Sequence, residues 1–287
     1  MSVVIEDQVR RRDGIAFATT VADSAYRARW DDEAAENHVR SAIANGPGQA
    51  PSDEALTAKV APLWGRFPEG LHVPSVLDVG AGYGRIDLYL ARERQLTCDS
   101  LCAVDISATM LEHLISYRKR FDVFPGAEVQ AICASADELP IADESIDLAI
   151  SSAVFLHMGK SFVRRAVREI ARVLRPGGAF VFDGAFPNAH NPSNWPPRLK
   201  PPRLRNPNAL KYWSRREVER LLSDSGLASR AGGYRLEPTR YAVLPKTIGP
   251  VSVPFARRVN DALGTPAWLD DLLAVSYSAY SPGAIAV

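Results

Sequence analysis

The chain has 287 residues, of which 46% are hydrophobic and 23% charged, so it can bury one substantial core together with an accessory layer. Its formal net charge is only +1, which leaves no overall field to hold a polyanion, so a nucleic-acid-binding role would need a local basic patch. The N-terminus has no apolar run of signal-peptide length, and the longest uncharged apolar run, Leu148–Met158, is too short to span a bilayer. We therefore expect a cytoplasmic protein that does not enter a membrane.

Residues 1–70 are predicted to form a helical N-terminal segment. Apolar side chains recur at helical spacing over Asp23–Ile43, where Tyr26 and Trp30 lie one turn apart. Two interpretations stay open for this aromatic pair, because it either packs the helix on the main domain or covers a bound ligand. A second short helix, Asp53–Arg66, leads into the first strand.

The stretch Ser75–Leu90, SVLDVGAGYGRIDLYL, predicts a buried strand, a tight glycine turn and the start of an amphipathic helix. Gly80, Gly82 and Gly84 stand where the chain must reverse without Cβ atoms in the way. Such a turn brings free backbone N–H groups to the carboxyl edge of a sheet, which is where a ligand binds.

The glycine spacing is G-x-G-x-G, because the third glycine of a dinucleotide fingerprint would fall on Arg85. No Gly-Lys-Ser/Thr follows, so a triphosphate P-loop is excluded. With Asp78 two places before Gly80, the stretch resembles the first motif of class I S-adenosylmethionine (SAM)-dependent methyltransferases. The resemblance implies an α/β fold, a doubly wound, mostly parallel seven-stranded sheet with helices on both faces, and SAM as cofactor with S-adenosylhomocysteine as product.

Two acids further along the chain match cofactor-binding positions of this family. Asp105 ends the second strand, Leu101–Val104, and the resemblance assigns it to the ribose hydroxyls; a helix N-cap is the alternative, although Ser107 suits that role better. Asp137 follows the third strand, Ala127–Cys133, and matches the acid that binds the adenine amino group, with a solvated turn acid as the alternative. The full set of expected cofactor-binding residues is Asp78, Gly80, Ala81, Gly82, Gly84, Arg85, Asp105, Ile106, Ala136, Asp137 and Ser152.

His157 follows the fourth strand, Ser145–Ser152, at the edge where the acceptor should meet the cofactor. Its pKa can be brought near neutrality, so it suits a general base that takes the proton of an acceptor hydroxyl; a structural histidine at the strand end is the alternative. The helix Phe162–Leu174, the turn R-P-G-G and the fifth strand, Ala179–Asp183, then follow in the order typical of the family.

From Gly184 the chain is rich in Pro, Asn and Arg and is predicted to form a flap over residues 184–211. A helix with an S-x-x-E capping box follows at Ser214–Ser225, and residues 227–245 are expected to supply two strands paired as an antiparallel hairpin. The predicted organisation is therefore a lid segment (1–70), which the family often builds from N-terminal helices, a SAM-binding core (71–245) and a C-terminal extension (246–287).

The absence of certain motifs limits the class of molecule that can be the methyl acceptor. The D/N-P-P-aromatic motif of DNA amino-methyltransferases, the Pro-Cys of pyrimidine enzymes and the loop glutamates of protein-arginine enzymes are all missing, so a small molecule is expected and DNA is not. Asparagines of the flap favour a sugar or polyol, and ordinary turn chemistry is the alternative. The candidate acceptor-binding residues are Tyr26, Trp30, Trp195, Arg198 and Tyr212.

Other possibilities stay open from the sequence. No histidines or acids stand at metal-ligand spacing, so no metal site is predicted, although a subset of the family uses magnesium. An RNA methyltransferase using the basic residues 198–211 and a non-catalytic SAM-binding subunit are the alternative functions, and a homodimer is a possible assembly.

Overall fold

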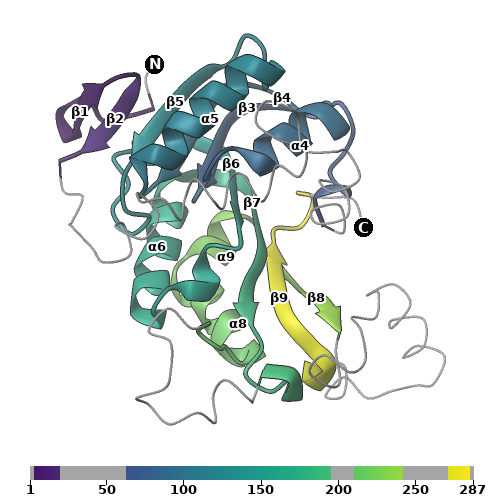
Figure 1. Cartoon of the computed structure of the whole chain (residues 1–287). Helices are drawn as coiled ribbons and strands as arrows, with labels where there is room; N and C mark the ends of the chain where they lie inside the picture. The colour runs from purple at the N-terminus through teal and green to yellow at the C-terminus, as the bar shows by residue number, and fades with distance from the viewer. Residues whose placement is uncertain (1–2, 20–62, 195–209, 242–270, 285–287) are drawn as a thin grey trace.

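The computed structural model describes residues 3–19, 63–194, 210–241 and 271–284, which form one twisted sheet covered by helices on both faces (Figure 1). Nine strands lie in the order β1-β2-β5-β4-β3-β6-β7-β9-β8. The strands are β1 Val9–Arg12, β2 Ile15–Ala18, β3 His72–Val79, β4 Thr97–Asp105, β5 Glu128–Cys133, β6 Ile146–Ser152, β7 Leu174–Pro187, β8 Arg235–Tyr241 and β9 Ala274–Tyr280. The helices are η1 Glu6–Gln8, α4 Arg85–Glu93, α5 Ala108–Phe121, η2 Phe155–His157, α6 Lys160–Val173, η3 Pro192–Asn194, α8 Arg215–Asp224 and α9 Leu227–Arg230.

The central strands β2 to β7 are all parallel, and the antiparallel pairs lie at the two ends of the sheet. Successive side chains of a strand point to opposite faces, so Leu77 and Val79 pack with α6, α8 and α9, whereas Val76 packs with α4 and α5. The predicted doubly wound, mostly parallel α/β sheet is confirmed, and its carboxyl edge gathers the residues after each parallel strand.

The prediction of seven strands is wrong, because nine are present among the described residues. The two additional strands form the hairpin β1–β2, where a helix was predicted, and β2 extends the sheet parallel to β5. Asp13 and Gly14 join them with φ values of 52° and 82°, the positive angles that a two-residue type I′ turn requires. An Asp-Gly pair between short strands is a strong hairpin signal, and it overrides helical propensity here. The candidate helix Asp23–Ile43 lies outside the described residues.

The C-terminal end of the sheet also differs from the prediction. Within the described part of this range, residues 227–241, one strand, β8, is present, and residues 227–230 form the short helix α9. The antiparallel partner of β8 is β9, which lies within the predicted C-terminal extension and is inserted between β7 and β8. The hairpin prediction failed because the partner is distant in sequence, and Gly226 with φ 81° starts a helical turn instead of a strand.

The R-P-G-G sequence lies inside β7, where a turn before the strand was predicted. Register with β6 jumps from Ile146↔Leu174 to Leu148↔Ala179, so these four residues form a bulge in which Gly177 has φ 78°. The strand then continues through Gly184 to Pro187, so the first residues of the predicted flap belong to the sheet. The capping box of α8 is confirmed, with Ser214 and Glu217 each bonding the backbone N–H of the other.

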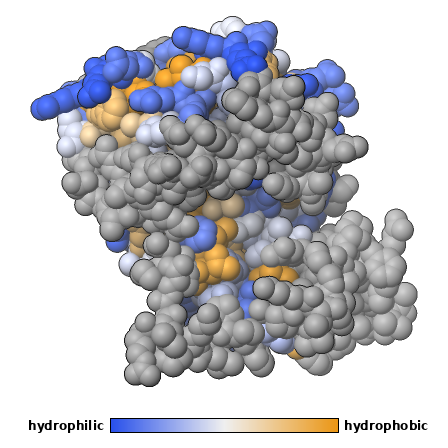
Figure 2. Space-filling view, viewed as in Figure 1, coloured by the Kyte–Doolittle hydropathy of each residue, from blue (hydrophilic) through white to orange (hydrophobic). Residues whose placement is uncertain are grey.

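The described surface in Figure 2 is mostly hydrophilic, with apolar patches near the middle and at the upper left of this face. All three cysteines are buried thiols. No helix within the described ranges is long and apolar enough to cross a bilayer.

Candidate functional site

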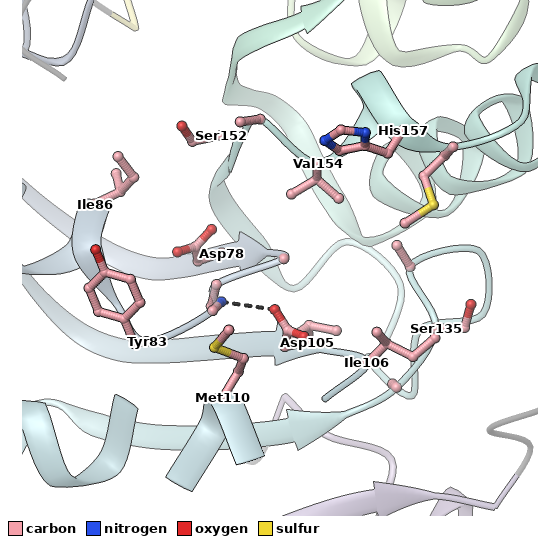
Figure 3. A pocket seen from close by; sticks show the side chains of 18 of the residues that line it. Asp78, Tyr83, Ile86, Asp105, Ile106, Met110, Ser135, Ser152, Val154 and His157 are labelled. Atoms are coloured by element: carbon pink, nitrogen blue, oxygen red, sulfur yellow. Dashed lines mark hydrogen bonds between the residues drawn. The ribbon is translucent and has the colours of Figure 1, made fainter. Parts of the chain in front are cut away.

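A cavity of about 310 Å³ opens at the carboxyl ends of β3, β4, β5 and β6 (Figure 3). This volume falls at the lower end of the usual range for small-molecule sites, roughly 300–1,000 Å³. Its walls come from the glycine turn, the segments after β4, β5 and β6, and the start of α6. The lining residues are Asp78, Gly80, Ala81, Gly82, Tyr83, Arg85, Ile86, Val104, Asp105, Ile106, Met110, Ala134, Ser135, Ala136, Ser152, Ala153, Val154, Leu156, His157, Met158 and Phe162.

The glycine turn is held in a conformation that other residues adopt with strain. Gly80, Gly82 and Gly84 have φ values of 73°, 55° and 81°. A Cβ on Gly80 would lie 2.2 Å from Cγ2 of Val154, so the close approach of the turn to the segment after β6 also requires glycine. The N–H groups of Gly80 and Ala81 both donate to the carbonyl of Val104, at 2.7 and 3.0 Å, which fixes the turn against β4.

Asp105 is oriented by two backbone donors. Its Oδ2 accepts from the N–H of Gly82 at 2.9 Å, the dashed line in Figure 3, and its Oδ1 accepts from the N–H of Ser107 at 2.9 Å. Ser107 itself caps α5 by accepting from the N–H of Met110, as predicted. The Asp105 carboxylate therefore lines the cavity in an orientation that these two backbone bonds fix.

Buried acids surround the glycine turn. Burial raises the pKa of Asp78 well above its usual range, and the nearby carboxylates of Asp87 and Asp105 add to the rise, while the guanidinium of Arg85 opposes it. Burial also raises the pKa of Asp87 to about 7. Arg85, the first residue of α4, thus places a cation at the cavity wall beside several carboxyl groups.

Two of the predicted cofactor residues do not line the cavity. Gly84 is the N-cap of α4 and acts on the shape of the turn. Asp137 is bonded to Arg165 and to the hydroxyl of Ser135, and the three residues before it, 134–136, reach the cavity wall. The structure brings all the other predicted cofactor residues to the cavity.

His157 lines the same cavity from η2, directly after β6. Figure 3 shows its ring beyond Val154, across the cavity from Asp105. Leu156, whose carbonyl accepts from the N–H of Lys211 at 2.8 Å, and the side chains of Met158 and Phe162 complete a largely apolar wall around it. A histidine in such a wall is placed to exchange a proton with a bound acceptor.

The structure describes only one of the predicted acceptor residues. Tyr26, Trp30, Trp195 and Arg198 lie outside the described residues. Tyr212 is described and half-buried, but it does not line the cavity. Within the described ranges, no three His, Cys, Asp or Glu side chains lie together as a candidate metal site.

The flap asparagines, interpreted from sequence as sugar ligands, are structural. Asn188, Asn191 and Asn194 are at most 8% exposed. Their side-chain amides donate to backbone carbonyls of residues 271–275, with distances of 2.6 to 3.0 Å, and Asn194 also donates to the carbonyl of Asn188. The sugar interpretation is therefore wrong for these three residues, because their donors are already used inside the protein.

Sequence reasoning missed several apolar wall residues, above all Tyr83, Met110 and Phe162. Two of these had a usable signal, since Tyr83 lies inside the glycine turn and Met110 lies in the first turn of the helix after Asp105. Phe162 had none, because its position depends on how α6 packs on the sheet.

Residues 77–182, from β3 to β7, match a family model described as a methyltransferase domain. Among curated relatives, dimethylglycine N-methyltransferase from Parasynechococcus marenigrum is 30% identical over 200 residues, which cover 67% of this chain and 66% of that protein. Malonyl-[acyl-carrier protein] O-methyltransferase from Methylococcus capsulatus is 38% identical over 109 residues, which cover 37% of this chain and 36% of that protein. The chain therefore spans less than two thirds of the length of either relative.

Among solved structures, phosphoethanolamine N-methyltransferase 2 of Haemonchus contortus in complex with SAM aligns with a TM-score of 0.56. The alignment covers 92% of this chain and 60% of that chain at 15% identity, so it is evidence for the fold alone. The family match and the fold agree with the resemblance that the glycine turn carries, and the two relatives include both an N- and an O-methyltransferase.

Proposed function

Because the chain belongs to the class I SAM-dependent methyltransferases, we propose that it transfers the methyl group of SAM to an oxygen of a polar small molecule, with His157 as the general base. The observation that carries this proposal is that His157 and the glycine turn line one cavity. A base and a methyl donor in the same small space meet the geometric requirement for transfer.

The cofactor is proposed to lie along the cavity wall formed by β3 and β4. Asp105 receives the ribose hydroxyls, and the adenine lies between Met110 and the segment Ala134–Ala136. The glycine turn would hold the methionine part, with Asp78 for its ammonium group and Arg85 for its carboxylate. The bound cofactor would supply an electrophilic methyl group to the cavity that His157 also lines.

The proposed reaction is an in-line displacement at the methyl carbon. The acceptor oxygen forms a bond to this carbon as the bond to sulfur breaks, and the positive charge on sulfur disappears. The apolar wall of Val154, Met158 and Phe162 keeps water from the sulfonium, so alignment and a dry site supply most of the acceleration. His157 accepts the hydroxyl proton during the transfer.

An amine acceptor is the second candidate, favoured by the 30% identity over 200 residues to an N-methyltransferase. In that case His157 removes a proton from an ammonium group before transfer, and the chemistry at the methyl carbon is unchanged. The described asparagines no longer favour a sugar or polyol, because they are buried and bonded within the protein. We therefore propose a small molecule that bears a hydroxyl group, without assigning it to the sugars. The alternative of an RNA methyltransferase depends on the basic residues 198–211, most of which are not described. The alternative of a non-catalytic SAM-binding subunit would not need a base at His157.

The test is single-turnover methyl transfer to a panel of hydroxyl and amine acceptors, followed by mass spectrometry of the product. We expect His157→Asn to slow transfer about 10²–10⁴-fold while leaving SAM affinity nearly intact, and the parent's rate to fall at acid pH. The matched control is His72→Asn, because His72 is exposed at the opposite end of β3 from the cavity. If His157→Asn keeps most of the parent's rate, His157 is structural; transfer only to amines would establish the second candidate.

A further inference from the structure

We infer that Arg165 is a positioning residue of the cofactor site, and that Asp137 acts through its ion pair with Arg165 instead of contacting the adenine. This inference rests on the proposed cofactor pose, in which Ser135 and Ala136 form the wall beside the adenine. The resemblance assigns Asp137 to the adenine amino group, and the contacts of its carboxylate argue for a different role.

Both carboxylate oxygens of Asp137 already accept hydrogen bonds. Nε and Nη2 of Arg165 donate to Oδ2 at 2.9 and 2.7 Å, and the hydroxyl of Ser135 donates to Oδ1 at 2.5 Å. The Asp137 side chain is only 16% exposed, whereas that of Arg165 is 55% exposed. Charge-assisted bonds of this length hold the carboxylate toward α6, which explains why Asp137 does not line the cavity.

The same helix holds this loop at further points. The N–H of Leu139 donates to Oε2 of Glu169 at 3.0 Å. Arg172 donates to the carbonyls of Leu139 and Ile141 at 2.9 and 2.8 Å. The loop that follows β5 is thus bound along one face of α6, and the Arg165 pair is the bond nearest to the cavity-lining residues.

Helix α6 also contributes to the acceptor side of the cavity. Phe162 lines the cavity, and the guanidinium carbon of Arg165 lies 5.8 Å from the centre of the Phe162 ring. Arg165 therefore contacts both the loop beside the proposed adenine position and an aromatic side chain near His157. Arg165 thus links the loop beside the proposed adenine position to the acceptor side of the cavity.

The experiment measures binding of S-adenosylhomocysteine and of an analogue whose adenine is replaced by unsubstituted purine. Removing the positioning pair should weaken both ligands equally, so we expect Arg165→Met and Asp137→Asn each to raise both dissociation constants about 3- to 30-fold. The double variant should be no worse than either single one, because each change breaks the same bond. Arg165→Lys, which retains the charge, should recover part of the loss.

The matched control is Arg164→Met, which removes a neighbouring exposed arginine that has no bond to the loop within the described residues. A direct contact between Asp137 and the adenine amino group predicts the opposite pattern: Asp137→Asn would weaken S-adenosylhomocysteine selectively, and Arg165→Met would have little effect. That pattern would overturn the role inferred for Arg165 and leave the proposed function intact. No binding of S-adenosylhomocysteine by the parent would overturn the proposed function as well.

Discussion

At the scale of single residues, the clearest feature is that Asp105 is oriented before any ligand arrives. Backbone N–H groups of Gly82 and Ser107 fix its two oxygens, so the ribose binding that we propose for Asp105 would cost little side-chain entropy. This arrangement was predictable, because the glycines, the acid and the capping serine are all close to strand ends that the apolar pattern locates.

We predict that Asp105→Ala weakens binding of S-adenosylhomocysteine by about 1.5–3 kcal/mol, the usual contribution of hydrogen bonds to a charged group. Isothermal titration calorimetry measures this directly. Asp99→Ala is the control, since Asp99 is an exposed acid on the same strand, β4, away from its carboxyl end. Equal affinity in the Asp105 variant and the parent would remove the ribose role.

At the scale of elements, the pairing of β9 could not be predicted from the sequence. Its pairing partners β7 and β8 precede it in the chain, with long segments between them, and no local pattern specifies such a contact. The asparagines were misinterpreted for the same reason, because the carbonyls that they bind lie some 80 residues further on. The β1–β2 hairpin is a different case: Asp13-Gly14 was a readable turn signal that the charged strand VRRR obscured.

The asparagines fix the segment before β9, and this gives a prediction about stability. Asn188→Ala removes donors to the carbonyls of Asp271 and Ala274 at 2.6 and 2.8 Å, and the carbonyl of Asp271 keeps the longer bond from the Tyr277 hydroxyl at 3.4 Å. We expect a loss of about 2–4 kcal/mol in the free energy of unfolding, measured by urea denaturation. Ser223→Ala, at an exposed position on α8, is the control and should change it by less than about 0.5 kcal/mol.

At the scale of the whole molecule, the buried acids connect stability to pH. Asp87 is only 2% exposed, and neither carboxylate oxygen has a hydrogen-bond partner among the described residues. Burial raises its pKa to about 7, above the value of about 3.9 for an unfolded aspartate. Between these values the folded chain holds more protons, so the contribution of Asp87 is greatest below about pH 4 and is lost as pH rises through 7.

We therefore predict that Asp87→Asn flattens the dependence of stability on pH. Relative to the parent, the variant should gain about 2–4 kcal/mol between pH 5 and pH 8, because its amide cannot ionise in the core. Urea denaturation at several pH values measures this difference, and Asp224→Asn, at an exposed position on α8, serves as the control. Parallel pH profiles for Asp87→Asn and the parent would contradict the assignment.

The position of β9 has a consequence for how the chain is made. A ribosome adds roughly 5–20 residues per second, so on the order of ten seconds separate the emergence of Pro187, at the end of β7, from that of Ala274, at the start of β9. During this interval the nascent chain can assemble the cofactor half of the sheet, while the outer edge of β7 has no strand to bond. An unpaired edge accepts any extended segment within reach, including one from a neighbouring nascent chain on the same messenger RNA.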